Sequence, residues 1–271
     1  MFKQTEDPPP SQQYLEKRAV NNQSWANQAC LHGSSIAATA STNWVRGAVL
    51  RRLRRIVKSS CRTLEVGCGN ASSLLGPLSR NCQAYGADLT MEMLSLARHH
   101  HRINGLVRCD ACYLPFTDES FDVVYTSRCL INVLDREMQR VAIRELFRVA
   151  RRTGIVVLIE NFEEPVSRLD EAKRRYNAGP PVIDDMNLRL NLDATIEYCR
   201  SLDWHPISMQ GNTMTNFAVQ IVLPKLIGQR GSQAVEAVLY PLCILLTLLD
   251  EKLGSRLPLL GKDVMVVFRR R

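Results

Sequence analysis

An apolar run that ends in two closely spaced glycines constrains the fold of this chain more than any other stretch. Thr63-Leu64-Glu65-Val66 leads directly into Gly67-Cys68-Gly69, and residues 71–75, Ala-Ser-Ser-Leu-Leu, suit the start of a helix. The two glycines let the backbone turn sharply and approach a ligand without a Cβ in the way. The pattern predicts a strand, a tight turn and a helix whose first N–H groups, near Ser72, point at a bound ligand.

A second apolar run, residues 84–87, ends in Asp88, which stands 19 residues after Gly69. An acidic side chain at the tip of a neighbouring strand is placed to bind ribose hydroxyls. Ser72 occupies the position where a dinucleotide fingerprint needs its third glycine, so the pattern favours a nucleoside without a pyrophosphate. A glycine pair alone is as typical of a plain turn in an α/β protein, and the interpretation therefore depends on the rest of the chain.

The remaining sequence alternates between strand-like and helix-like segments, as a doubly wound α/β sheet requires. We expect a mostly parallel, seven-stranded Rossmann-like sheet with a helical N-terminal segment and a helical insertion before the last strand. The expected strands are residues 63–67, 82–88, 106–110, 121–126, 154–160, 204–210 and 262–269. The expected core helices are residues 72–80, 90–103, 135–150, 163–176 and 193–202.

Several of these segments together resemble the motifs of class I S-adenosylmethionine (SAM) dependent methyltransferases, over roughly residues 62–161. Glu65-Val66-Gly67-Cys68-Gly69 looks like the first motif of that family, with Ala71 as the third small residue. Residues 120–126 look like its fourth strand, and residues 145–154 look like the helix and turn into its fifth. The motifs occur in the order of the family, which makes the resemblance specific.

The resemblance implies which residues hold the cofactor. Asp88 matches the acid that binds the ribose, Asp110 the acid that meets the adenine amino group, and Ala111 the residue whose backbone amide meets the ring. The residues that the resemblance implies for SAM binding are Glu65, Gly67, Cys68, Gly69, Asp88, Leu89, Asp110, Ala111 and Ser127.

The acceptor is expected beyond the ends of the fourth and fifth strands, because ligands of open α/β sheets bind outside the carboxyl ends of the strands. The polar residues predicted to serve catalysis or the acceptor there are Arg128, Asn132, Glu160 and Asn161. An alternative of equal weight is that Arg128 pairs with a nearby carboxylate and that Asn132 caps the helix starting near Asp135. The identity of a general base stays open.

Looser similarities concern the acceptor. Residues 130–132, the turn at 179–181 and residues 187–193 are similar to a subgroup of bacterial methyltransferases of surface-polysaccharide and other small-molecule pathways. This resemblance implies methyl transfer to an oxygen or nitrogen of a small-molecule, sugar or carrier-linked acceptor. The Asp/Asn-Pro-Pro-Tyr tetrapeptide of enzymes that methylate base nitrogens or protein glutamine is missing after residue 126, which argues against nucleic acid. A catalytically silent SAM-binding regulator is another hypothesis.

The net charge of +8 permits an anionic partner. Much of the excess lies in residues 44–58, where arginines alternate with apolar residues at helical spacing. The favoured interpretation is an amphipathic helix that covers the sheet and keeps its basic face in water. The alternative is an RNA or lipid-headgroup methyltransferase that binds phosphates with this helix.

Composition favours a single domain. We expect a tail at residues 1–13 and one methyltransferase domain at 14–271, with a helical cap at 14–58 and a helical insertion at 212–260. Nine irregularly spaced cysteines and the lack of an export signal predict reduced thiols in the cytoplasm. No metal site is expected, because the consecutive histidines 99–101 of one helix cannot converge on one ion.

The predicted insertion contains an apolar run, residues 238–249. It is too short to span a bilayer, which needs ~20 residues. The favoured interpretation is a helix packed in a lid or in a homodimer interface, and contact with a membrane surface is the second interpretation.

Overall fold

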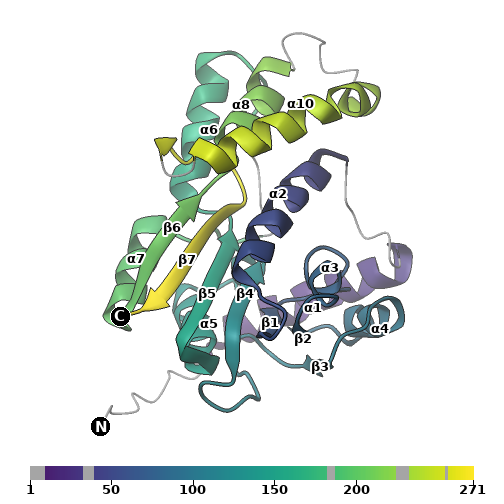
Figure 1. Ribbon diagram of the computed structural model, residues 1–271, viewed down its shortest axis with the longest axis vertical. Helices are drawn as coiled ribbons and strands as arrows, with labels where there is room; N and C mark the ends of the chain where they lie inside the picture. The colour runs from purple at the N-terminus through teal and green to yellow at the C-terminus, as the bar shows by residue number, and fades with distance from the viewer. Residues whose placement is uncertain (1–9, 33–39, 182–186, 224–231, 254–255) are drawn as a thin grey trace.

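The computed structural model describes residues 10–32, 40–181, 187–223, 232–253 and 256–271 (Figure 1). Its strands are β1 (Arg62–Val66), β2 (Gln83–Asp88), β3 (Gly105–Arg108), β4 (Phe121–Ser127), β5 (Ala150–Glu160), β6 (Trp204–Gln210) and β7 (Val264–Arg270). Its α-helices are α1 (Gln12–His32), α2 (Ala40–Ile56), α3 (Leu75–Leu78), α4 (Met91–His100), α5 (Arg136–Val149), α6 (Glu163–Arg175), α7 (Leu192–Ser201), α8 (Thr213–Phe217) and α10 (Ser232–Leu253). A 3₁₀-helix, η2 (Leu130–Asn132), and a π-helix, η3 (Ala218–Val222), complete the described elements.

The strands form one seven-stranded sheet in the order β3-β2-β1-β4-β5-β7-β6. Neighbouring strands are parallel from β3 to β5, whereas β7 runs antiparallel to both β5 and β6. The predicted mostly parallel, doubly wound sheet is confirmed, together with the helical N-terminal segment and the helical insertion before the last strand. Residues 1–9 of the tail predicted at 1–13 and insertion residues 224–231 and 254–255 lie outside the described residues, whereas α1 begins at Gln12, inside that predicted tail. The other domain limits stay a prediction.

Helices cover both faces of the sheet, because successive side chains of a strand point to opposite faces. In β5, Val156 and Leu158 pack into a core shared with α5 and α7. Their neighbours Val157 and Ile159 pack into a second core on the other face, shared with α2 and α3. The sheet is therefore buried on both sides, and its carboxyl edge is the open part of the sheet where a site can form.

The helix predicted at residues 72–80 is wrong in its start and its length. After β1 the chain passes through turns, and only the four residues of α3 are helical. Gly76 and Pro77 occupy half of that short helix, and both are unfavourable in a longer one, since proline lacks the N–H group that a helix interior needs. The N–H group of Ser72 donates instead to Oδ1 of Asn70 at 3.2 Å. Residues 72–74 are therefore a turn, and no helix N-terminus lies at Ser72.

Part of the basic face of α2 is buried. Arg52 is only 3% exposed and donates to the carbonyl of Gly211 at 3.2 Å and to Oδ1 of Asn212 at 3.3 Å. Burial, as the largest effect, lowers the pKa of this guanidinium. The expectation that the basic face lies in water is wrong at this position, because Arg52 joins α2 to the segment after β6.

Two further arginines of α2 fasten it to α10. Arg51 and Arg55 each pair with the buried carboxylate of Glu251 at 2.8 Å. Arg54, on the same helix, is exposed. Figure 1 shows α6, α8 and α10 gathered at one end of the molecule, with α2 reaching toward α10. The insertion is thus held to the N-terminal helices by charge pairs.

The α10 helix continues without a break through Pro241, so the proline does not interrupt the apolar run. Its Leu242, Leu245 and Leu248 are exposed. In the part of the chain that the structure describes, no helix is long and apolar enough to cross a membrane. A homodimer contact and a membrane surface both stay predictions for these leucines.

The variant Glu251→Gln tests the junction between α2 and α10. We expect the free energy of unfolding to fall by about 1 to 2 kcal/mol, because a neutral amide cannot satisfy two guanidinium groups as a carboxylate does. Urea denaturation followed by circular dichroism measures the change. Glu197→Gln, at an exposed position of α7, is the matched control. Equal stability of the two variants would show that the charge pairs do not hold the helices together.

Candidate functional site

A cavity of about 460 Å³ opens at the carboxyl ends of β1, β2, β4 and β5. Its wall brings together all the residues predicted to bind SAM and three of the residues predicted for the acceptor side. The predicted residues that line it are Glu65, Gly67, Cys68, Gly69, Asp88, Leu89, Asp110, Ala111, Ser127, Arg128, Asn132 and Asn161. Their role in binding is still a prediction.

The turn after β1 has the conformation that its glycines were expected to provide. Gly67 and Gly69 both have positive φ angles, of 75° and 51°. A Cβ on Gly67 would lie 2.5 Å from the side chain of Cys129, so no other residue fits there without a shift of the chain. Ala71 also has a positive φ, of 59°, in a buried position. The turn therefore lines the cavity with its backbone atoms, and the side chain of Cys129 packs closely against Gly67.

Asp88 ties the tip of β2 to this turn. Its Oδ2 accepts the N–H group of Gly69 at 2.7 Å, and its Oδ1 accepts the N–H group of Thr90 at 2.9 Å. Burial raises the pKa of this carboxyl above its ordinary value, and the two N–H donors oppose the shift. Each carboxylate oxygen keeps further acceptor capacity, so the group can also bind hydroxyls of a ligand.

Glu65 stands at the end of β1 and is buried against Tyr125, whose hydroxyl donates to Oε2 at 3.0 Å. Burial raises the pKa of Glu65 to about 8, although the tyrosine hydroxyl and the N–H group of Leu75 lower it. The carboxyl lines the cavity from below the glycine turn. It is positioned for a cationic ligand group, which would favour its charged form.

Helix α1, which belongs to the helical cap predicted at residues 14–58, forms a wall of the cavity, although the sequence analysis named none of its lining residues. The sequence does contain a pattern that indicates this wall. Five of the lining residues of α1 are spaced by four, three, one and three residues, so they share one face of the helix. These residues are Tyr14, Arg18, Asn21, Asn22 and Trp25.

Four polar contacts hold α1 over the site. Arg18 pairs with Asp110 at 3.0 Å, and Asn22 accepts the hydroxyl of Thr90 at 3.0 Å. The others join Tyr14 to Cys112 at 3.7 Å and the amide of Asn21 to the carbonyl of Asn132 at 3.1 Å. The predicted adenine-binding acid therefore already has a cationic partner on α1.

At the other end of the cavity, Arg128 and Asp263 face each other at 3.9 Å. Both have positive φ angles, of 52° and 59°, which are rare for residues with side chains. The amide of Asn132 donates to the carbonyl of Arg128 at 2.7 Å, and Oδ1 of Asn161 accepts the N–H group of Asp263 at 3.0 Å. The two asparagines thus hold the backbone of the two strained residues.

This geometry tests the alternative interpretation of two of these residues, namely that Arg128 pairs with a carboxylate and that Asn132 caps the following helix. The pairing of Arg128 with a carboxylate is confirmed. The hypothesis that Asn132 caps the following helix is wrong, because Oδ1 of Asp135 accepts the N–H group of Met138 at 3.0 Å and so caps α5.

Glu160 is the predicted acceptor residue that the structure does not bring to the cavity. It is fully buried at the end of β5 and is not part of the lining. Its Oε1 accepts the N–H groups of Cys129 at 3.0 Å and Leu130 at 3.1 Å. Burial raises the pKa of Glu160 to about 7 against the effect of these donors. The structure corrects the expected contact between Glu160 and an acceptor. Glu160 lies outside the cavity lining and holds the start of η2 in position through these two hydrogen bonds.

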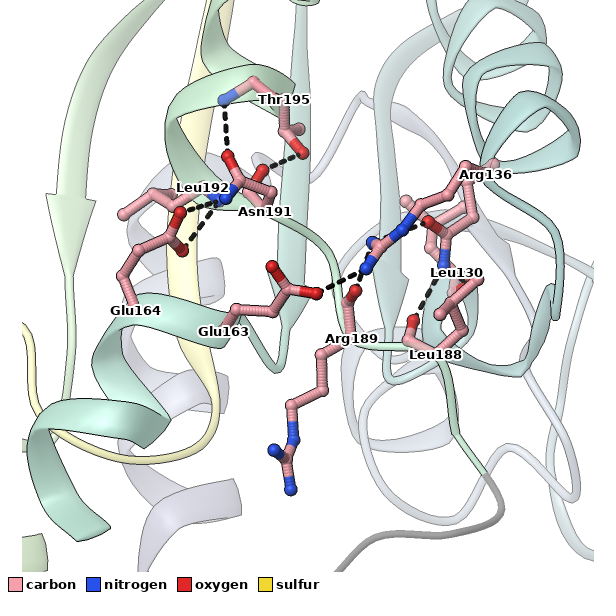
Figure 2. A network of polar contacts seen from close by, with 11 residues as sticks. Leu130, Arg136, Glu163, Glu164, Leu188, Arg189, Asn191, Leu192 and Thr195 are labelled. Carbon is pink, nitrogen blue, oxygen red and sulfur yellow. Dashed lines mark hydrogen bonds and ion pairs between the residues drawn. The ribbon is translucent and has the colours of Figure 1, made fainter.

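Asn187 lines the cavity, and the residues that follow it, 188–192, are fastened by the network in Figure 2. The N–H group of Leu188 donates to the carbonyl of Ile131 at 2.8 Å, so the segment lies against η2. Gln139 of α5 donates to the carbonyls of Leu188 at 2.7 Å and Leu130 at 3.0 Å. Further contacts join Arg136 to Glu163 and to the carbonyl of Arg189, Glu164 to the N–H group of Leu192, and Thr195 to the carbonyl of Asn191.

Two cysteines on either side of Asp110, Cys109 and Cys112, have structural surroundings. Cys112 is buried, and its Sγ also lies 3.4 Å from the carbonyl of Met138. Burial raises the pKa of Cys109 to about 12, which keeps this thiol protonated and unreactive. Within the described ranges, no group of three or more histidine, cysteine or acidic side chains could hold a metal ion.

Comparison with known proteins gives a family match for part of the chain. A protein family described as "Methyltransferase domain" matches residues 64–158, which run from β1 to β5. The match covers about a third of the chain, and together with the sheet order it supports a SAM-dependent methyltransferase domain over these residues.

Individual relatives share parts of the chain. The ubiquinone/menaquinone biosynthesis C-methyltransferase UbiE of Vibrio campbellii is 35% identical over 127 residues, which cover 43% of this chain and 46% of the relative. The chain thus spans about half the length of the curated relatives that it matches.

Two solved structures show the same fold. A SAM-dependent methyltransferase from Archaeoglobus fulgidus is 18% identical, with a TM-score of 0.56 over 84% of this chain and 94% of that chain. Phosphoethanolamine N-methyltransferase 1 of Haemonchus contortus is 12% identical, with a TM-score of 0.60 over 94% of this chain and 49% of that chain. At these identities the likeness concerns the fold alone.

The raised pKa of Glu160 predicts a pH dependence of stability. Its pKa rises from 4.5 to about 7 on folding, so the folded chain binds more protons in this window and loses stability as the pH rises through it. Glu160→Gln keeps an oxygen for the N–H groups of η2 but does not titrate. We expect its stability to fall less than that of the wild type between about pH 5 and about pH 7, by up to about 3 kcal/mol.

Urea denaturation at several pH values measures this difference, and Glu65 titrates equally in both proteins. Parallel stability curves for the wild type and Glu160→Gln would contradict the assignment.

Proposed function

We propose that this protein transfers the methyl group of SAM to a small-molecule, sugar or carrier-linked acceptor that binds at the Arg128 end of the cavity. The observation that carries the proposal is that the glycine turn, Asp88 and the acceptor-end residues all line one cavity of about 460 Å³. A methyl donor at one end and an acceptor at the other would be held together, and holding two reactants in line is most of what such a transfer requires.

The residues at the cofactor end fit SAM. The two hydrogen bonds of Asp88 fix its carboxylate, and the remaining lone pairs can accept two ribose hydroxyls. The backbone of Gly67 and Gly69 lets the amino-acid part approach closely, since neither residue has a Cβ. The buried carboxyl of Glu65 lies where it can meet a cationic amino group. When bound, SAM supplies an electrophilic methyl group on a sulfonium.

The acceptor atom is proposed to be oxygen or nitrogen. Transfer to either can require loss of a proton, and a carboxylate at the acceptor end would serve. Asp263 is such a group, while the lining carboxylates Glu65, Asp88 and Asp110 lie at the cofactor end. Asp263 is therefore our candidate for the proton acceptor. The relatives of the UbiE type are named C-methyltransferases, which adds carbon as a second candidate acceptor atom.

The RNA or lipid-headgroup alternative loses support from the contacts of α2. Arg51, Arg52 and Arg55 are all engaged within the protein, so they do not present an open row of cations to phosphates. A small acceptor inside the cavity agrees better with these contacts.

The variant Asp88→Ala tests the cofactor site. We expect SAM to bind about 1 to 3 kcal/mol more weakly, because ribose hydroxyls lose their charged acceptor and the turn at Gly69 loses its anchor. Isothermal titration calorimetry with SAM and with S-adenosylhomocysteine measures the change, and thermal unfolding verifies that the variant is folded. An unchanged affinity would count against the placement of the ribose at Asp88.

Turnover is tested with methyl-labelled SAM and a cell extract fractionated into metabolites, glycans, lipids and RNA. We expect label in a small-molecule or glycan fraction, and loss of that label with Asp88→Ala. Tight SAM binding without labelling of any fraction would instead favour a catalytically silent regulator, and label in RNA would restore the nucleic-acid alternative.

A further inference from the structure

Helix α10 turns polar residues inward and leucines outward. Leu242, Leu245 and Leu248 are 46%, 52% and 43% exposed, whereas Thr247 and Asp250 are almost completely buried. The leucines follow one another at spacings of three residues, so they share one face of the helix, and positions 247 and 250 lie on the opposite face. A helix that covers a globular core normally buries its apolar face and exposes its polar one. In this part of α10 the arrangement is reversed.

The inward face of α10 is fixed by its two carboxylates. Asp250 accepts the N–H groups of residues 214 and 215, at 2.8 Å and 3.1 Å, where α8 begins. Glu251 pairs with Arg51 and Arg55 of α2, each at 2.8 Å. Because burying either carboxylate without such partners would be costly, these contacts decide which face of α10 points inward. The leucines are left on the outside.

The outward face carries a positive charge over residues 242–253. Lys252 stands four residues after Leu248, so it lies on the leucine face, and it is exposed. The other charged residues of this stretch, Asp250 and Glu251, belong to the inward face. A helix face of leucines with a cation beside them is suited to an anionic membrane surface, because the leucines can enter the acyl boundary while the lipid headgroups attract the cation.

Other exposed apolar side chains gather at the same end of the molecule. They are Tyr176 at the end of α6, Phe217 of α8 and Val222 of η3, and the rings of the first two pack edge to face at 5.8 Å. Figure 1 shows α6 and α8 at the same end as α10. Of the twelve large apolar side chains that are exposed among the described residues, six therefore lie at this end. Such a concentration marks a contact surface.

A second copy of the chain fits this face less well than a membrane does. In a two-fold dimer the same face meets itself, and over residues 242–253 this face offers Lys252 no carboxylate. The chain also carries a net charge of +8, so two copies repel each other, whereas an anionic surface attracts each of them. Charge therefore favours the membrane surface.

We propose that the outward face of α10, formed by Leu242, Leu245, Leu248 and Lys252, docks on the surface of an anionic phospholipid membrane. The helix would lie parallel to the membrane, with its leucines in the acyl boundary and Lys252 among the headgroups. This inference goes beyond the proposed methyl transfer and does not depend on it.

Docking through α10 would be transmitted to the cavity by α2. Val45 and Val49 of α2 line the cavity, and Arg51 of the same helix is fastened to Glu251 of α10. One helix thus joins the docking face to the cavity wall. An acceptor linked to a lipid carrier, which is among the acceptor classes proposed above, would be held in the same membrane as the enzyme.

Cosedimentation of the full chain with vesicles tests the proposal. The vesicles are phosphatidylcholine alone or phosphatidylcholine mixed with phosphatidylglycerol. We expect the wild type to bind the mixed vesicles more tightly, and to lose most of this preference at high salt, which screens the charges. Leu245→Ser/Leu248→Ser should bind the mixed vesicles about tenfold more weakly, because less apolar surface leaves water. Lys252→Gln should bind them about fivefold more weakly.

Leu31→Ser and Lys17→Gln are the matched controls. Both residues are exposed on α1, away from α10 in Figure 1, and neither lines the cavity. We expect both controls to bind the mixed vesicles like the wild type. Thermal unfolding verifies that each variant is folded, as expected for substitutions of exposed side chains.

Several results would overturn the inference. They are no binding of the wild type to the mixed vesicles, equal binding to both kinds of vesicle, unchanged binding of the leucine double variant, and equal weakening in the controls. Sedimentation velocity without vesicles tests the second copy. A wild-type dimer that the leucine double variant converts to a monomer would assign this face to a homodimer instead. None of these measurements involves SAM, so failure of docking would leave the proposed methyl transfer unaffected.

Discussion

The carboxylate of Asp88 is the contact on which the site depends. It joins the tip of β2 to the turn after β1 through the N–H group of Gly69 at 2.7 Å, and it joins the same tip to the start of α4 through Thr90 at 2.9 Å. The backbone adds to this anchor, because the N–H groups of Gly67 and Cys68 both donate to the carbonyl of Ala87, at 2.8 Å and 3.1 Å. Because both oxygens are already oriented, the carboxylate can meet ribose hydroxyls without first being ordered, which limits the entropy lost on binding.

A second strained pair forms the opposite side of the cavity. Arg128 and Asp263 both have positive φ, and Asn132 and Asn161 hold their backbones through side-chain hydrogen bonds. Glu160 stabilises the same region from the interior by accepting two N–H groups at the start of η2. Strain that is fixed by several independent contacts is typical of functional sites. The backbone is thus fixed at both ends of the cavity. Glycines allow the turn at one end, and the side chains of two asparagines hold Arg128 and Asp263 at the other.

Local patterns in the sequence were sufficient for the sheet and for the residues that line the cavity around Gly67 and Asp88, because strand alternation and the glycine turn are properties of neighbouring residues. They failed where the outcome depends on distant partners. Glu160 lies in the predicted strand, yet the direction of its carboxylate is set by the N–H groups of η2, thirty and thirty-one residues away. The arginines of α2 read as a solvated face, but Arg51 meets Glu251, which is 200 residues further along the chain. The helix predicted at residues 72–80 failed for a local reason, because Gly76 and Pro77 both disfavour a long helix and α3 has only four residues.

The cover provided by α1 is compatible with a bound cofactor. Asp110, the residue matched to adenine recognition, already accepts the N–H group of Cys112 on Oδ1 and pairs with Arg18 through Oδ2. A carboxylate oxygen has two acceptor sites, so an adenine amino group can share the carboxylate with the guanidinium and need not displace it. The ion pair therefore holds α1 over this end of the cavity and leaves acceptor capacity on Asp110 for a ligand.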